Sequence, residues 1–150
     1  MKSATRGLTL GRMWALLRPS DPNQATHSEK WIAAGGGFAG ILAVIWISHG
    51  VLDPQGATLV VGSMGASAVL LFAVPHGALS QPWAVLGGHL ISAFIGVSCA
   101  KYIGDPLLAP ALAVGLSIAA MYYLHCLHPP GGATALVAVL GGEAVRELGY

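Results

Sequence analysis

The stretch His125-Cys126-Leu127-His128-Pro129-Pro130-Gly131-Gly132-Ala133-Thr134 places helix-breaking and polar residues between two long apolar runs. Hydrocarbon tolerates irregular backbone only where protein or a water-filled cavity surrounds it. A weaker copy, Asp53-Pro54-Gln55-Gly56-Ala57-Thr58, occurs earlier in the chain. The two stretches together predict the walls of a polar site inside a membrane protein, which favours a transporter or a channel.

The composition predicts an integral membrane protein. Hydrophobic residues make up 55% of the chain and charged residues 9%, whereas soluble domains carry roughly 25% charged residues. Apolar runs of about 20 residues match the thickness of a bilayer, and four of them occur, at 31–50, 58–74, 83–102 and 107–127. A fifth run, 134–140, is too short to span.

The expected fold class is therefore all-α, a polytopic transmembrane helical bundle with broken or re-entrant helix starts. Four spans are too few to enclose a wide pathway within one copy, so we expect a homo-oligomer. Five of the seven basic residues precede the first span. By the positive-inside rule, this bias predicts a cytoplasmic N-terminus. We expect a multi-pass protein of a bacterial inner membrane.

The first 30 residues form a separate segment, and residues 31–150 form the transmembrane domain. Within the segment, residues 12–18 are amphipathic and end at Pro19, a pattern typical of a helix that lies at the headgroup level. The basic residues here are too sparse to indicate a nucleic-acid partner. The expected partner is the lipid bilayer.

An internal repeat appears when the sequence is shifted against itself by 76 positions. Nine of the 21 aligned positions from 49 to 69 are identical, including Pro54 with Pro130 and Thr58 with Thr134. The two copies would enter the membrane from opposite sides, which is the inverted-repeat plan of many transporters. The same offset requires a partner for the third span near residues 159–178, so we expect the chain to be part of a six-segment protein.

Each break precedes an apolar run, so each predicts a helix start within the membrane. Unpaired backbone N–H groups and the helix dipole favour an anion there, and Thr58 and Thr134 are expected to cap the two helices. Two starts converging on one site would suit a small inorganic anion. The candidate substrate-binding residues are Gly56, Ala57, Thr58, His128, Gly131, Gly132, Ala133 and Thr134.

Histidine side chains add a possible proton function. His128 is the leading candidate, and His49, His89 and His125 are further candidates for handling protons or lining the path. An inside-negative potential opposes anion entry by about 2.3 kcal/mol per 100 mV, whereas an anion that travels with one proton moves electroneutrally. The alternative is that these histidines cap helix ends at the interface.

A metal-binding or sensory membrane module is the alternative function. His125, Cys126 and His128 have suitable ligand types, although no acidic partner is evident near them. The sequence contains no GxSxG, HExxH or P-loop motif, so we expect neither enzyme activity nor a cofactor.

Small residues predict close helix contacts. Gly36 and Gly40 form a GxxxG pair, and Gly88, Ser92 and Gly96 form a stripe in the third span. Such residues let helix backbones approach one another. We expect these small residues to pack within the chain rather than to form an interface between two copies.

Three ordered motifs resemble those of the HPP family of integral membrane proteins, which is named for a His-Pro-Pro tripeptide. They are His128-Pro129-Pro130-Gly131-Gly132-Ala133-Thr134, the run 62–72 (GSMGASAVLLF) and the run 81–90 (QPWAVLGGHL). The resemblance covers roughly residues 30 to 150. It implies a compact multi-span domain and, because members from cyanobacteria and chloroplasts are associated with nitrite transport, nitrite as the substrate. An anion site formed by helix starts would suit nitrate, formate or chloride equally well.

Overall fold

The computed structural model describes residues 25–50 and 54–150, and this part of the chain is entirely helical. The predicted all-α class is thereby confirmed. Along the chain the elements are α2 (His27–His49), α3 (Pro54–Ala73), the 3-10 helix η1 (Ala78–Ser80), α4 (Pro82–Tyr102), α5 (Leu108–Tyr123), α6 (Pro129–Leu140) and α7 (Gly142–Glu147). The predicted amphipathic segment 12–18 and Asp53 lie outside the described residues.

Helix α2 begins four residues earlier than the apolar run predicts. The Thr26 side chain accepts a hydrogen bond from the Glu29 N–H, and the Glu29 carboxylate accepts one from the Thr26 N–H at 2.6 Å. This capping box satisfies backbone donors that would otherwise be unpaired at the helix start. The polar turn before Trp31 therefore belongs to the helix rather than to a preceding segment.

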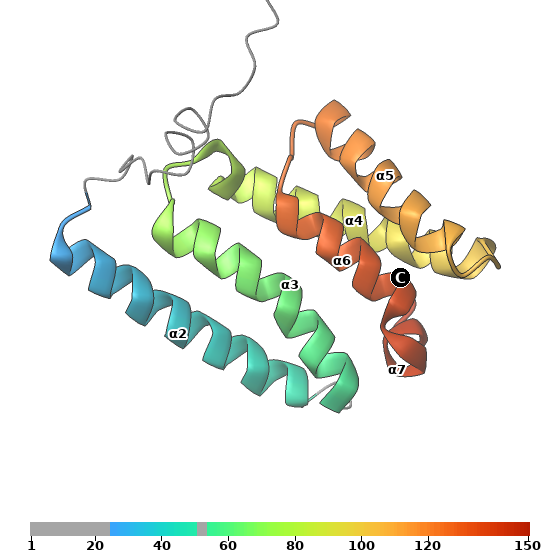
Figure 1. The fold of residues 1–150 in the computed structure, drawn as a ribbon, viewed down its shortest axis with the longest axis horizontal. Coiled ribbons are helices and arrows are strands. Elements are labelled where there is room, and N and C mark those ends of the chain that lie inside the picture. The colour runs from blue at the N-terminus through green and yellow to red at the C-terminus, as the bar shows by residue number, and fades with distance from the viewer. Residues whose placement is uncertain (1–24, 51–53) are drawn as a thin grey trace, which may run out of the picture.

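Helices α2 and α3 form one group, α4 and α5 form another, and the short helix α6 packs against both groups. Helices α2 and α3 make an antiparallel pair, and α6 lies between α3 and α5 while also packing on α4 (Figure 1). Helix α6 runs in the opposite direction to α3. As a result, the break before α6 lies near the end of α3 rather than near its start.

Glycines bring α4 and α6 into close contact. A Cβ added at Gly96 would lie 2.7 Å from the Ala135 carbonyl oxygen, and one added at Gly131 would lie 2.7 Å from the Gly88 carbonyl oxygen. We call the set Gly88, Ser92, Gly96, Gly131 and Ala135 the glycine seam. The predicted stripe of small residues in the third span therefore packs within the chain.

In the part of the chain that the structure describes, two helices, α2 and α4, are long and apolar enough to cross a membrane. Helix α5 has 16 residues and α6 has 12, or about 24 and 18 Å at roughly 1.5 Å per residue. The predicted fourth span, 107–127, was too long, because the backbone leaves the helix at Leu124 and His125 takes a φ of 52°. The inverted repeat and the re-entrant helix starts stay predictions.

Candidate functional site: a buried histidine network

The turn between α5 and α6 is held in place from several sides. The indole Nε1 of Trp83 donates to the Leu124 carbonyl oxygen at 3.0 Å, and the Cys126 N–H donates to the Met121 carbonyl oxygen at 2.9 Å. Cys126 is fully buried, and Gly87 of α4 leaves the space that its side chain occupies. These contacts fix where the chain enters α6.

His128 ends this turn and precedes the first residue of α6. Its side chain is fully buried. Nδ1 lies 2.7 Å from the carbonyl oxygen of Leu79 in η1, and Nε2 lies 2.9 Å from Oγ of Ser67 in α3. Both ring nitrogens therefore have partners, as a buried polar side chain requires.

His89 of α4 extends the same network. Its Nε2 lies 2.8 Å from Ser67 Oγ, and its Nδ1 lies 2.7 Å from Oγ1 of Thr134 in α6. Ser67 is buried, whereas His89 and Thr134 are partly buried. We call Ser67, His89, His128 and Thr134 the histidine network; it joins α3, α4 and α6 at one place.

Local sequence explains why the rings can meet. A Cβ added at Gly88 would lie 2.5 Å from the Cβ of His128, so only glycine at this position leaves room for the buried ring. On α3, Ser63 and Ser67 are spaced by four residues and share one helix face. That face presents hydroxyls in a helix that is otherwise almost wholly apolar.

The first break lies away from this network, which corrects the expectation that both helix starts converge on one site. Pro54 begins α3, and Ser67 is about 13 residues further along, a rise of about 20 Å at roughly 1.5 Å per residue. Gly56, Ala57 and Thr58 are in the first turns of α3.

The predicted threonine caps are also wrong. Thr58 Oγ1 donates to the Pro54 carbonyl oxygen at 2.7 Å, and Thr134 Oγ1 lies 3.3 Å from the Pro130 carbonyl oxygen. Each threonine is therefore inside its helix, four residues after a proline. The proline, which is well suited to the first turn of a helix, moves the helix start ahead of the threonine.

The N-terminus of α6 offers fewer free donors than expected. Pro129 and Pro130 occupy its first two positions and have no N–H, and the Gly131 N–H donates to the His128 carbonyl oxygen at 2.9 Å. Gly131 is buried in the glycine seam. Gly132 and Ala133 instead line a mainly apolar hollow of about 420 Å³ between α5 and α6.

The remaining predicted histidines do not join the network. His49 is the last residue of α2 and is exposed. His125 is exposed, whereas Cys126 is buried and His128 directs both nitrogens to other partners. Within residues 25–50 and 54–150, no three His, Cys, Asp or Glu side chains gather in a way that would hold a metal ion.

Comparison with known families decides the affiliation. The family model described as "HPP, transmembrane region" matches residues 22–150. The chain belongs to the HPP transmembrane family. This assignment confirms the resemblance drawn from the three motifs, and it makes the protein a membrane protein.

Two curated transmembrane proteins of Dictyostelium discoideum are relatives of this HPP chain. One is 41% identical over 131 residues, covering 84% of this chain and 45% of the relative, and the other is 37% identical over 118 residues, covering 76% and 37%. This chain thus spans less than half the length of these relatives. No solved structure matches it.

Sequence reasoning missed two partners of the HPP histidine. Ser67 lies within the family-like run 62–72, and its spacing of four residues from Ser63 was the available signal. Leu79 contributes only its backbone carbonyl, which no side-chain pattern can reveal. The contacts place Ser67, His89, His128 and Thr134 together, two of which were predicted to bind substrate and one to line the path.

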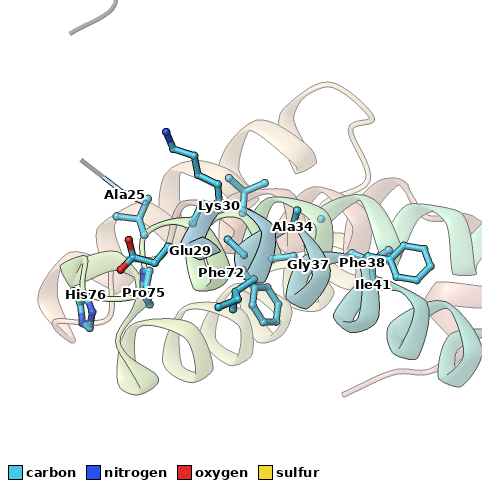
Figure 2. Close-up of a pocket in the computed structure, with 17 residues that line it drawn as sticks. Ala25, Glu29, Lys30, Ala34, Gly37, Phe38, Ile41, Phe72, Pro75 and His76 are labelled. Atoms are coloured by element: carbon cyan, nitrogen blue, oxygen red, sulfur yellow. The ribbon is translucent and has the colours of Figure 1, made fainter. Parts of the chain in front are cut away.

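A separate groove of about 980 Å³ runs between α2 and α3 (Figure 2). Figure 2 shows Glu29 and His76 at one end of it and Phe38 and Ile41 further along. Gly65 and Ala68 of α3 line this groove, whereas Ser67 faces the histidines. Helix α3 therefore has an apolar surface on the groove and a polar surface on the network.

Proposed function

We propose that this chain is the transmembrane part of a transporter or channel for a small inorganic anion, with nitrite as the first substrate to test. The observation that carries the proposal is the full burial of His128 at a helix break, with both ring nitrogens hydrogen-bonded. Ionisable groups inside a membrane are costly and mark substrate or proton pathways by default. Nitrite comes from the family resemblance.

The pathway would border the histidine network at His89 and Thr134. These two residues are partly buried, while Ser67 and His128 are buried behind them. Because α6 begins with two prolines, side-chain donors rather than backbone N–H groups would supply the hydrogen bonds to the anion. With the N-terminus in the cytoplasm, as the basic residues predict, the break before α6 would lie toward the cytoplasmic side.

A proton moving with the anion would remove the electrical penalty of its entry. That penalty is about 2.3 kcal/mol per charge at 100 mV, so one proton for each nitrite makes the transport insensitive to membrane potential. The histidine network is the group in the described helices best suited to carry this proton, because it joins two imidazoles whose ring nitrogens can each bind or release a proton. Transport in this proposal involves no chemical conversion of the anion.

We also propose that the α2–α3 and α5–α6 units are inverted repeats, and that several copies assemble around the pathway. The opposite directions of α3 and α6 and the matching threonine-to-proline contacts, Thr58 with Pro54 and Thr134 with Pro130, support the first idea. The few spans within one copy support the second. Chemical cross-linking of the full-length protein in membranes tests for the oligomer, and a band of monomer size alone would contradict it.

Nitrite flux into proteoliposomes tests the function. The full-length wild-type protein is compared with His128→Gln and with His76→Gln, a matched control because His76 lies in the exposed turn after α3. We expect His128→Gln to reduce flux at least about tenfold while His76→Gln retains it. Well-folded wild-type protein that carries neither nitrite, nitrate, formate nor chloride would overturn the proposal.

A further inference from the structure

When both histidines are neutral, the hydrogen bonds of the histidine network all run in one direction, because the Leu79 carbonyl at one end can only accept. The Leu79 carbonyl oxygen has no hydrogen, so Nδ1 of His128 must carry the proton in their 2.7 Å hydrogen bond. A neutral His128 then has a bare Nε2. That atom must accept the hydroxyl hydrogen of Ser67, 2.9 Å away.

The same reasoning continues to the other end of the network. Since Ser67 spends its single hydrogen on His128, its oxygen accepts from Nε2–H of His89 at 2.8 Å. The bare Nδ1 of His89 in turn accepts from the Thr134 hydroxyl at 2.7 Å. One directed chain of hydrogen bonds, from Thr134 to the Leu79 carbonyl, satisfies every nitrogen while both histidines are neutral.

We propose that this chain binds one exchangeable proton, which is received by His89 and stored on buried His128, with Ser67 as the relay. The proton adds to Nδ1 of His89. The Nε2 proton of His89 then moves to Ser67 Oγ as the original Ser67 hydroxyl proton moves to Nε2 of His128. The product is a His128 imidazolium and a neutral His89 that now carries its proton on Nδ1, with one proton gained and no electrons exchanged.

Thr134 already has the second partner that this shift requires. When His89 Nδ1 becomes a donor, Thr134 Oγ1 accepts from it, and its hydroxyl hydrogen turns to the Pro130 carbonyl oxygen at 3.3 Å. The hydrogen-bonded chain is therefore complete in both states. Thr134, at the partly buried end, changes direction with the proton.

The imidazolium at His128 has hydrogen-bond partners, and charge repulsion limits the network to one positive charge. An imidazolium at His128 donates to both the Leu79 carbonyl and Ser67, so each of its N–H groups has an acceptor. A second imidazolium 4.9 Å away between ring centroids is opposed by like-charge repulsion. The store therefore holds one proton per chain.

Few other titratable groups face the network. Helix α3 contributes the hydroxyls of Ser63 and Ser67, η1 a carbonyl, α4 His89, and α6 Thr134, while the neighbouring turn adds the Cys126 thiol packed on Gly87. Within residues 25–50 and 54–150, no charged side chain is hydrogen-bonded to the network. The described charged residues lie elsewhere, at Glu29, Lys30, Lys101, Asp105, Glu143, Arg146 and Glu147.

This inference rests on the proposed function, because the stored proton would balance the charge of the transported anion. Proton binding itself can be measured without any anion flux. The full-length protein with ¹⁵N-labelled histidine is placed in lipid nanodiscs, and the ring nitrogens are followed by NMR through a pH titration. We expect His89 and His128 to change together and take up one proton, while exposed His76 titrates separately. Two protons taken up in independent steps would overturn the proposal.

Variants of Ser67 test the relay. In Ser67→Ala we expect the joint titration to be lost, and in Ser67→Thr, which keeps a hydroxyl, we expect it to be restored. Ser63→Ala is the matched control, one turn away with its hydroxyl on the Val60 carbonyl, and should leave the titration unchanged. An unchanged titration in folded Ser67→Ala would refute the relay, and the wild-type titration decides the one-proton store even if that variant does not fold.

The two proposals fail separately. A joint titration without flux of any tested anion would retain the proton store and remove the transport function. Anion flux together with independent histidine titrations would retain the transport function and remove the proton store.

Discussion

The imidazole rings of His89 and His128 stand edge to face at 64°, and the single hydroxyl of Ser67 contacts Nε2 of both. Each of the three side chains comes from a different part of the chain, so α3, α4 and the start of α6 meet at one oxygen atom. A hydroxyl carries one hydrogen and can donate it to only one ring at a time. Because Ser67 belongs to α3, its hydroxyl ties α3 to whichever of the two rings accepts that hydrogen.

Two adjacent glycines are expected to respond oppositely to the same substitution. A Cβ at Gly131 would meet the Gly88 carbonyl oxygen and Ser92 Oγ within 2.8 Å, whereas a Cβ at Gly132 would meet nothing within 4 Å. Gly131→Ala should lower the free energy of unfolding by about 1–3 kcal/mol through overpacking. Gly132→Ala should leave it unchanged or raise it by up to about 1 kcal/mol, because alanine favours a helix.

Unfolding of both variants by denaturant in detergent micelles checks this pair. Equal destabilisation by the two substitutions would show that the glycine seam is not the reason for the difference.

His125 is expected to matter for its backbone rather than its ring. Its φ of 52° lies in the left-handed region, which costs an ordinary residue roughly 1–2 kcal/mol. His125→Gly should retain both stability and nitrite flux, whereas the β-branched His125→Val should be less stable by about 1–2 kcal/mol. Loss of nitrite flux in a stable His125→Gly protein would show that the His125 ring takes part in transport.

Trp83 is expected to keep the turn before α6 closed. Trp83→Phe removes the hydrogen bond to the Leu124 carbonyl, which is worth about 0.5–1.5 kcal/mol. In a Cys99→Ala background, buried Cys126 should then react with a thiol reagent about two to ten times faster, since labelling requires local opening. Trp46→Phe on exposed α2 is the control, and an equal acceleration there would rule out a specific effect.

Asp105 is expected to make stability depend on acidic pH. Its carboxylate accepts the backbone N–H groups of Leu108 at 2.8 Å and Leu107 at 2.9 Å, and these hydrogen bonds lower its pKa. Because the folded pKa is below the unfolded one, the stabilisation is present above the unfolded pKa and is lost as pH falls through the folded pKa. The melting temperature of wild type minus that of Asp105→Asn should therefore shrink on acidification, and a constant difference would contradict this.

How much the sequence revealed differed from one helix to another. Residues 83–102 were predicted almost to the residue for α4, because Pro82 marks its start and the apolar run stops at its end. The end of α5 was missed because residues 124–127 are mostly apolar, and composition does not show that Trp83 and Met121 hold that segment as a turn. Composition predicts burial in lipid or protein, but not where a helix stops within it.

The histidine network was only partly accessible to prediction. His89 and His128 were expected to matter, but Ser67 is separated from them by 22 and 61 residues. Its spacing from Ser63 marks a polar face of α3, but it does not show which residues that face contacts. The expected convergence of the two breaks failed for a related reason. Similar sequences at two breaks do not show how deep each helix start lies, because that depends on side-chain contacts such as that between Gly88 and His128.

The long sequence separations within the histidine network also set an order of events during synthesis. Ser67 is made before His89 and well before His128, so α3 is complete before either ring exists. In that interval the carbonyl of Ser63, 3.5 Å from Ser67 Oγ, is the partner available within the helix itself. The newly made α3 thus supplies a temporary acceptor, the Ser63 carbonyl, for the Ser67 hydroxyl. The histidine network is completed only when α6 packs against α3 and α4, which makes that packing a late step of assembly.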